Sequence, residues 1–165
     1  MEQRQSLSIA PPPNQSYTFQ EILNERVIKT DVDARLPARV IEEVGRLLLE
    51  VDAIWPSYIK AMQNLYSLYG AYMVIAPNTA LLHAGPEMGS KKLAISLVTL
   101  HSPIHFGHKV YDPVKIAMAF SSPLNSVHTN TLSEIFNFFA VPENRERIIN
   151  AANAREVLSA LQKTE

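Results

Sequence analysis

Residues 79–89, TALLHAGPEMG, are the most informative segment of this chain. In it an apolar run ends in His83, and a turn rich in glycine and proline follows at once. This order predicts an imidazole at the end of a core strand, beside a loop whose backbone can come close to a ligand. The unperturbed pKa of histidine is about 6.5, so His83 is suited to exchanging a proton or a phosphoryl group near neutral pH.

Short apolar runs around this stretch indicate a sheet. We expect strands at residues 72–76, 80–82, 93–100 and 114–120, and a short edge strand at 104–106. The run at 114–120 is continuously apolar, as expected for a strand in a sheet that is covered on both faces.

Helical periodicity appears before and after these strands. Val40, Val44 and Leu48 mark one apolar face of a helix over residues 36–51, and Pro37 fits its first turn. The other helices are expected at residues 56–68, ending at Gly70, at 127–140, from Pro142 onward and at 153–162, with a short helix or docked segment at 19–28. Together the pattern predicts a compact α/β sandwich of one domain, with a mixed, mostly parallel sheet of about five strands flanked by helices.

Composition sets the limits of function. The 165 residues suit one domain, and a net charge of −1 gives no reason to expect direct contact with nucleic acid or an anionic membrane. The absence of cysteine excludes disulfides, thiolate nucleophiles and zinc–thiolate sites. No apolar run reaches the roughly 20 residues of a membrane span, and the first residues lack the apolar core of a signal peptide, so we expect a cytoplasmic protein. Residues 1–16 are polar and proline-rich, which predicts a flexible tail or linker.

Three of the five histidines lie between two predicted strands, at His101, His105 and His108. The spacing of His105 and His108 superficially resembles a metal pair, but a turn containing Gly107 need not place both side chains on one face, and zinc needs further ligands. We therefore interpret these as solvated loop histidines and expect no metal site.

His83 and His128 form the more informative pair, because each follows a predicted strand. Ligands of α/β proteins bind where strand ends, loops and helix N-termini converge. His128 is expected in the first turn of its helix, where unpaired backbone N–H groups favour an anion. Each histidine taken alone also fits a boundary residue with a satisfied hydrogen bond.

Two blocks of sequence resemble the enzyme IIA domain of the sugar phosphotransferase system (PTS), of the mannitol/fructose class (EIIA type 2) and its ascorbate type. The first block is IAPNTALLHAGPEMG at residues 75–89, followed by KLAISLV at 92–98; the second is KIAMAFSSP at 115–123, followed by His128 and Leu132. The resemblance extends over about residues 19–162, and we assign residues 17–165 to such a domain.

The resemblance implies a role for each histidine. His83 would be the phosphorylated nucleophile, and His128 would support the phosphoryl site. Gly85 and Glu87 would border that site. The chain departs from the family pattern at Gly85, where arginine is common; at Met88, where aspartate is common; and at Leu82, where many members have proline.

The resemblance also implies the partners. The carrier protein HPr would donate the phosphoryl group, and a cognate enzyme IIB would accept it and reach the membrane permease for carbohydrate uptake. Such a phosphotransferase uses no cofactor. The sugar stays open between ascorbate, a pentitol and a fructose-like hexitol.

Two other readings of the chain stay open. One is an EIIA-like regulatory domain of a sugar-responsive transcription regulator, which the PTS would phosphorylate; the proline-rich start is typical of a linker. The other is a plain binding module with inert histidines. The cluster of Tyr66, Tyr69 and Tyr72 fits either the core or an interface, and the core is the commoner place.

Overall fold

The computed structural model describes residues 18–162, without the side chains of residues 125–129. In this part the strands are β1 (Ile28–Val32), β2 (Val74–Ala76), β3 (Thr79–Leu82), β4 (Ala94–Ile104) and β5 (Val114–Ser121). The helices are α1 (Phe19–Ile22), α2 (Pro37–Glu50), α3 (Pro56–Tyr69), α4 (Asn125–Phe139), α5 (Pro142–Ile149) and α6 (Ala154–Gln162). Three short 3₁₀ turns are η2 (Glu25–Val27), η3 (Ala71–Met73) and η4 (Pro86–Met88).

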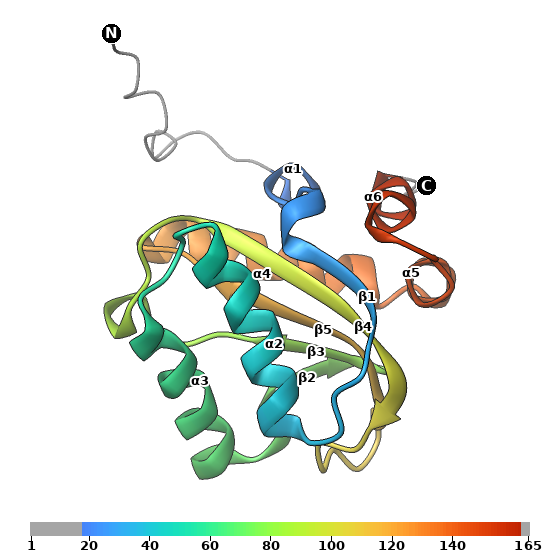
Figure 1. Cartoon of the computed structure of the whole chain (residues 1–165), viewed down its shortest axis with the longest axis horizontal. Helices are drawn as coiled ribbons and strands as arrows, with labels where there is room; N and C mark the ends of the chain where they lie inside the picture. The colour runs from blue at the N-terminus through green and yellow to red at the C-terminus, as the bar shows by residue number, and fades with distance from the viewer. Residues whose placement is uncertain (1–17, 163–165) are drawn as a thin grey trace, which may run out of the picture.

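Helices cover both faces of a single sheet. In Figure 1, α2 and α3 lie in front of the strands and α4 lies behind them, with α5 and α6 at one side. Alternate strand residues serve the two layers: Ala80 and Leu82 of β3 join the core under α2 and α3, whereas Leu81 joins the core with α4. The predicted α/β sandwich is therefore confirmed.

The strand order is β1-β4-β5-β3-β2. β1 with β4 and β3 with β5 are parallel, whereas β4 with β5 and β2 with β3 are antiparallel. The described part has five strands, the number expected, but the prediction of a mostly parallel sheet is wrong. Parallel neighbours need a crossover of about a dozen residues or more. Residues 105–113 between β4 and β5, and residues 77–78 between β2 and β3, are too few for one.

The two helices on the front face follow the sequence signals closely. Pro37 and Pro56 begin α2 and α3, where a missing N–H costs no helical hydrogen bond. Gly70 ends α3 with a φ of 73°, a conformation that glycine adopts without strain. A Cβ atom on Gly45 would lie 2.5 Å from Cγ1 of Ile59, so the glycine lets α2 and α3 pack closely.

The sequence prediction differs from the structure in two strands. Where a short helix or docked segment was expected at 19–28, α1 has four residues, and the chain then enters β1 at Ile28. Only Ile28 and Val32 of β1 are buried, which is too little alternation to reveal a strand. β4 runs on to Ile104, which pairs with Val114 of β5 inside the sheet, so the predicted edge strand at 104–106 is wrong.

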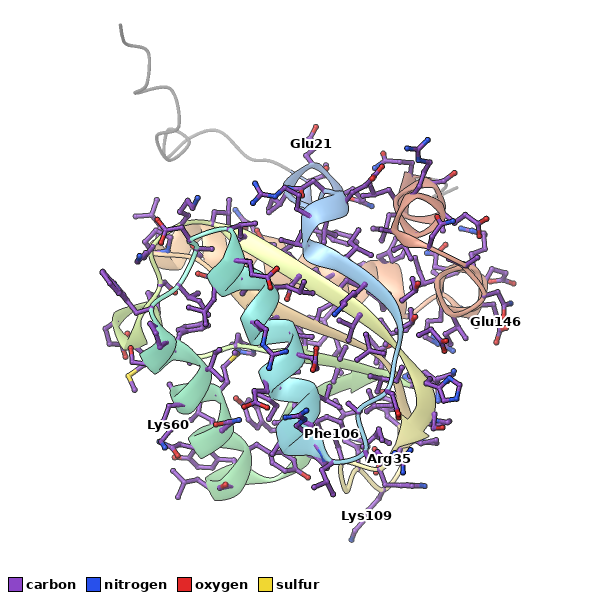
Figure 2. All side chains as sticks on the ribbon, in the orientation of Figure 1. Glu21, Arg35, Lys60, Phe106, Lys109 and Glu146 are labelled. Atoms are coloured by element: carbon purple, nitrogen blue, oxygen red, sulfur yellow. The ribbon has the colours of Figure 1, made fainter. Side chains whose placement is uncertain are left out.

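The charged side chains lie at the surface. Figure 2 shows Lys60, Lys109 and Glu146 pointing away from the layers of the sandwich. No helix in the described part of the chain is long and apolar enough to cross a membrane. The predicted tail at residues 1–16 lies outside the described residues.

One buried hydroxyl joins α3 to the ends of two neighbouring strands. Oη of Tyr58 accepts a hydrogen bond from the backbone N–H of Ala84 at 2.9 Å and donates to the carbonyl oxygen of Phe120 at 2.7 Å. Tyr58 is fully buried, and burial raises the pKa of its phenol, so the hydroxyl keeps its proton. The bond therefore holds the chain just beyond His83 against the end of β5.

We expect Tyr58→Phe to lower the free energy of unfolding by about 1–3 kcal/mol, because the variant leaves the buried Ala84 N–H without this acceptor. Urea unfolding followed by circular dichroism measures the difference. Tyr69→Phe is the matched control: Tyr69 is 68% exposed, and loss of its hydroxyl should change the free energy of unfolding by less than about 0.5 kcal/mol. Equal stability of Tyr58→Phe and the wild type would contradict the prediction.

Candidate functional site

His83 is the first residue after β3, a strand whose four residues are all buried. β3 and β5 run parallel, with Leu82 paired to Ala119, so the chain leaves both strands at the same edge of the sheet. After β5 the chain enters α4, and His128 is in the first turn of that helix. The backbone therefore brings both candidate histidines to one edge, as predicted. The side chain of His128 lies outside the described residues, so its contact with His83 stays a prediction.

The imidazole of His83 has a defined hydrogen-bonding partner on its own strand. Its Nδ1 lies 3.3 Å from the carbonyl oxygen of Leu81. A carbonyl oxygen only accepts, so Nδ1 carries the proton and donates it. In this tautomer the lone pair of the ring is on Nε2, which makes Nε2 the nucleophilic atom.

Burial decides the charge of the imidazole. His83 is half-buried, and burial lowers its pKa, while the hydrogen bond to the Leu81 carbonyl opposes that shift in part. The neutral form therefore predominates near neutral pH. A neutral imidazole with a fixed tautomer is what a phosphoryl acceptor requires.

An aromatic wall stands beside His83. It consists of Tyr69 and Tyr72, whose rings meet edge to face at 6.3 Å between centroids. The hydroxyl of Tyr72 donates to the backbone carbonyl oxygen of His83 at 3.3 Å, and its ring lies 6.2 Å from the imidazole. Tyr69 is 68% and Tyr72 43% exposed, so for these two a place in the core is wrong. Tyr66 packs against the core and donates to the carbonyl of Phe106 at 2.7 Å.

The wall and the His83 loop enclose a shallow hollow of about 390 Å³. Its lining is mostly apolar and is formed by Leu65, Tyr69, Tyr72, His83, Ala84, Gly85 and Pro86. A charged ligand would find no charged side chain among these residues. The hollow suits an apolar protein surface better than a small polar substrate.

The loop after His83 is fixed to α3 at its far end as well as at Ala84. The backbone N–H of Trp55 donates to the carbonyl oxygen of Gly89 at 2.8 Å. The hydroxyl of Ser57 donates to the carbonyl oxygen of Met88 at 3.2 Å. Gly89 has a φ of 132°, and a Cβ there would lie 3.1 Å from the backbone nitrogen of Tyr58. Glycine is therefore required at this position, and the loop is held rigidly against the start of α3.

Gly85 lines the hollow and Glu87 lies next to it, while their place at the border of the phosphoryl site stays a prediction. A Cβ atom on Gly85 would lie 2.6 Å from Oε2 of Glu87, so the carboxylate is folded back over the glycine. The φ of Gly85 is −61°, which every residue adopts, and the backbone does not require glycine here. Glycine in place of the arginine that is common in the family therefore removes a positive charge, and it does not change the conformation of the loop.

The family is decided by a match over nearly the whole chain. Residues 21–164 match the model of the family described as "Phosphoenolpyruvate-dependent sugar phosphotransferase system, EIIA 2". The chain belongs to this family.

Among curated proteins, this EIIA is 35% identical over 119 residues to the ascorbate-specific PTS system EIIA component of Salmonella choleraesuis, covering 72% of this chain and 77% of that protein. Among solved structures, PtxA of Streptococcus mutans, described as a candidate PTS IIA, has a TM-score of 0.81 and 26% identity, covering 90% of this chain and 95% of that one. The mannitol IIA of Escherichia coli, solved in complex with phosphorylated mannitol IIB, has a TM-score of 0.73 and 19% identity, covering 84% and 96% of the two chains, and shares the fold.

These findings confirm the predicted recognition and activity. The protein is a phosphotransferase of the PTS, a phosphoryl carrier that acts through a phosphohistidine. The alternative of a domain in a transcription regulator has no support from the relatives named above. Which histidine carries the phosphoryl group is a separate question, which the geometry of His83 addresses.

The other described histidines of this EIIA have structural partners. His108 accepts at Nδ1 from the backbone N–H groups of Val110 and Tyr111 and stacks on the Tyr111 ring. His101 belongs to β4 and not to a loop, and its Nδ1 lies 2.8 Å from Asp31. Among the residues that the structure describes, no three His, Cys, Asp or Glu side chains form a group that could hold a metal ion.

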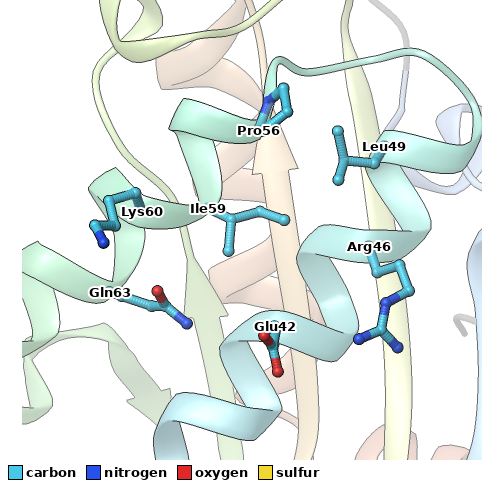
Figure 3. Close-up of a pocket in the computed structure, with 7 residues that line it drawn as sticks. All are labelled: Glu42, Arg46, Leu49, Pro56, Ile59, Lys60 and Gln63. Carbon is cyan, nitrogen blue, oxygen red and sulfur yellow. The ribbon is translucent and has the colours of Figure 1, made fainter.

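A second hollow lies between α2 and α3 (Figure 3). It measures about 300 Å³ and is lined by Glu42, Arg46, Leu49, Pro56, Ile59, Lys60 and Gln63. No histidine is among its lining residues, and the family's carriers act through a phosphohistidine. The phosphoryl site is therefore sought at the His83 hollow.

From the sequence alone, neither Tyr58 nor Tyr72 is placed at this site; Tyr72 is named only as one of three tyrosines that fit the core or an interface. Tyr58 lies in a helix 26 residues before Ala84, and Tyr72 precedes His83 by 11 residues. Neither belongs to the motif around the histidine, and only the packing of α3 and η3 against the strand ends brings them there. The spacing of the tyrosines does not indicate that Tyr72 lies beside His83, and no sequence signal marks Tyr58.

The lowered pKa of His83 gives stability a pH dependence of defined sign. The unfolded chain protonates this histidine near pH 6.5, about the unperturbed value, and the folded chain does so only at lower pH. Between those two values the unfolded chain binds the extra proton. The free energy of unfolding therefore falls as the pH drops below about 6.5, and this contribution levels off below the folded pKa. Urea unfolding across pH should show a smaller loss in His83→Gln than in the wild type.

An NMR titration of the imidazole resonances reads the same pKa directly. The resonances of His83 are assigned by their absence in the His83→Gln spectrum. A midpoint at or above pH 6.5 in the folded protein would contradict the expected shift.

Proposed function

We propose that His83 is the phosphohistidine of this EIIA, with Nε2 as the atom that accepts the phosphoryl group. The observation that carries the proposal is the Nδ1 contact to the Leu81 carbonyl, which leaves the ring lone pair on Nε2. The half-buried position at the mouth of an apolar hollow supports it, because a partner can cover the site and exclude water there.

In this reaction no proton on His83 has to move. The lone pair of Nε2 forms a bond to phosphorus while the bond between phosphorus and the donor's histidine nitrogen breaks, and the donor leaves as an imidazole. Nδ1 keeps its proton throughout, and the Leu81 carbonyl stabilises the positive charge that develops on the ring. Transfer to the next acceptor reverses these bond changes. Positioning and charge stabilisation are then the main tasks of the protein.

His128 and the start of α4 supply the charge stabilisation in this proposal. α4 has 15 residues, and the backbone N–H groups of its first turn have no acceptor inside the helix. His128 belongs to that turn, at the edge of the sheet where β3 and β5 end. Donors at this place would bind the phosphoryl oxygens.

The partners proposed for this chain are HPr as the donor and an enzyme IIB as the acceptor. The mannitol IIA that shares this fold was solved together with phosphorylated mannitol IIB, which supports a IIB partner. The apolar hollow and the exposed aromatic wall beside His83 suit a transient protein contact. The reaction is proposed to occur in the cytoplasm, and the membrane permease is reached through IIB.

The sequence relatives favour an ascorbate system. The Salmonella relative is named ascorbate-specific, and we propose the same class of IIB acceptor here. Transfer of label to an ascorbate IIB but not to a mannitol IIB would support this choice. Preferred transfer to the mannitol IIB would contradict it.

The test of the carrier function is phosphorylation of the purified protein by phosphoenolpyruvate, enzyme I and HPr. The wild type should acquire an acid-labile phosphate, and His83→Gln should acquire none, because glutamine keeps polarity and size but has no nucleophilic nitrogen. His128→Ala should be labelled about 10- to 1000-fold more slowly, since it removes one charge-stabilising donor.

Labelling of His83→Gln at the wild-type rate would place the phosphohistidine elsewhere. A normal rate for His128→Ala would remove that residue from the mechanism. Circular dichroism of each variant, and a known EIIA labelled in the same tube, serve as controls for folding and for the donor proteins.

Gly85→Arg tests the change of charge at the edge of the site. The backbone accepts the residue, and the new guanidinium can pair with Glu87 and then with the phosphoryl oxygens. We expect several-fold faster labelling with unchanged thermal stability, and Gly85→Gln as control should show no gain. A slower Gly85→Arg variant would contradict this role of charge.

A further inference from the structure

Tyr72 occupies a place that the phosphoryl-transfer motif does not account for. Gly70 ends α3, and the 3₁₀ turn η3 then carries Tyr72 to the end of β3 before β2 begins. There its hydroxyl donates to the backbone carbonyl oxygen of His83, at 3.3 Å. The side chain of Tyr72 therefore contacts the backbone of the very residue whose ring is proposed to react.

The ring of Tyr72 also meets the imidazole itself. The two rings are 6.2 Å apart between centroids and inclined at 67°, an edge-to-face contact. The residues that line the hollow carry no Asp, Glu, Lys or Arg side chain, and the carboxylate of Glu87 is folded over Gly85. The pKa of His83 is therefore lowered mainly because neighbouring groups exclude water from the imidazole.

We propose that Tyr72 is a positioning residue for His83: its hydroxyl fixes the His83 backbone, and its ring excludes water from one side of the imidazole. The reaction it serves is the phosphorylation of His83, so the proposal rests on the proposed function. Tyr72 exchanges no atom. It keeps the ring neutral and directs Nε2 while the bond to phosphorus forms there and the bond to the donor nitrogen breaks.

Tyr69 serves as the control that distinguishes positioning of His83 from contact with a partner protein. It lines the same hollow and contacts the Tyr72 ring at 6.3 Å, and its side chain is the more exposed of the two. A partner protein that covers the hollow would touch both tyrosines. The hydroxyl of Tyr72 also donates to the backbone carbonyl oxygen of His83.

The experiment compares Tyr72→Phe, Tyr72→Leu and the control Tyr69→Leu in two measurements. The first is an NMR titration of the His83 imidazole in the unphosphorylated protein. The second is single-turnover labelling by phosphorylated HPr over a range of HPr concentrations, which separates the maximal rate from the concentration at half-saturation.

We expect Tyr72→Leu to move the pKa of His83 back toward about 6.5 and to lower the maximal rate about tenfold. Tyr72→Phe keeps the ring, so it should keep the pKa and lower the maximal rate less. Tyr69→Leu should raise the HPr concentration at half-saturation while the pKa and the maximal rate stay at the wild-type values.

A different pattern would overturn the proposal. If both Tyr72 variants keep the wild-type pKa and maximal rate, and only the half-saturation concentration rises as in Tyr69→Leu, Tyr72 is a docking contact. If Tyr72→Leu does not fold, Tyr72→Phe decides by its maximal rate alone. If the wild type is not labelled at all, the proposed function fails, and the titration still shows whether Tyr72 sets the pKa of His83.

Discussion

The site depends on one buried hydroxyl. Oη of Tyr58 is bonded to Ala84, the residue after His83, and to Phe120 of β5. These two bonds fix the ends of two parallel strands relative to each other and to α3. Inside a protein such bonds are strong, because an unpaired buried group has no water to replace its partner. The position of His83 at the sheet edge is thus set by a residue from a helix on the front face.

The protonation state of His83 follows from the partial burial of its imidazole. Burial keeps the imidazole neutral, and the Leu81 carbonyl keeps the proton on Nδ1. Neither effect needs a charged neighbour, which agrees with the apolar lining of the hollow. A carrier must give up its phosphoryl group as readily as it accepts it. A neutral ring with one fixed proton serves both directions, since the protonation state is the same before and after.

His83 lies between an anchored loop on one side and two exposed tyrosines on the other. The loop after His83 is anchored to α3 through Gly89 and Met88, so its backbone is rigid. On the other side, Tyr72 and Tyr69 form an exposed wall. In the mechanism proposed above, the start of α4 and the partner protein bind the phosphoryl oxygens. Because position 85 is glycine, this loop lacks the positive charge of the arginine that is common there in the family.

Local sequence determined the elements whose signals are local. The apolar periodicity of α2, the prolines that begin α2 and α3, Gly70 and the apolar run before His83 each act within a few residues, and each was predicted correctly. The mixed direction of the sheet, the strand β1 and the places of Tyr58 and Tyr72 were decided by tertiary structure. β1 has only two buried side chains, so its sequence carries no clear strand pattern. Its backbone pairing with β4 makes it a strand. Tyr58 and Tyr72 reach the site only because distant segments pack together, and contacts between distant segments leave no periodic trace in the sequence.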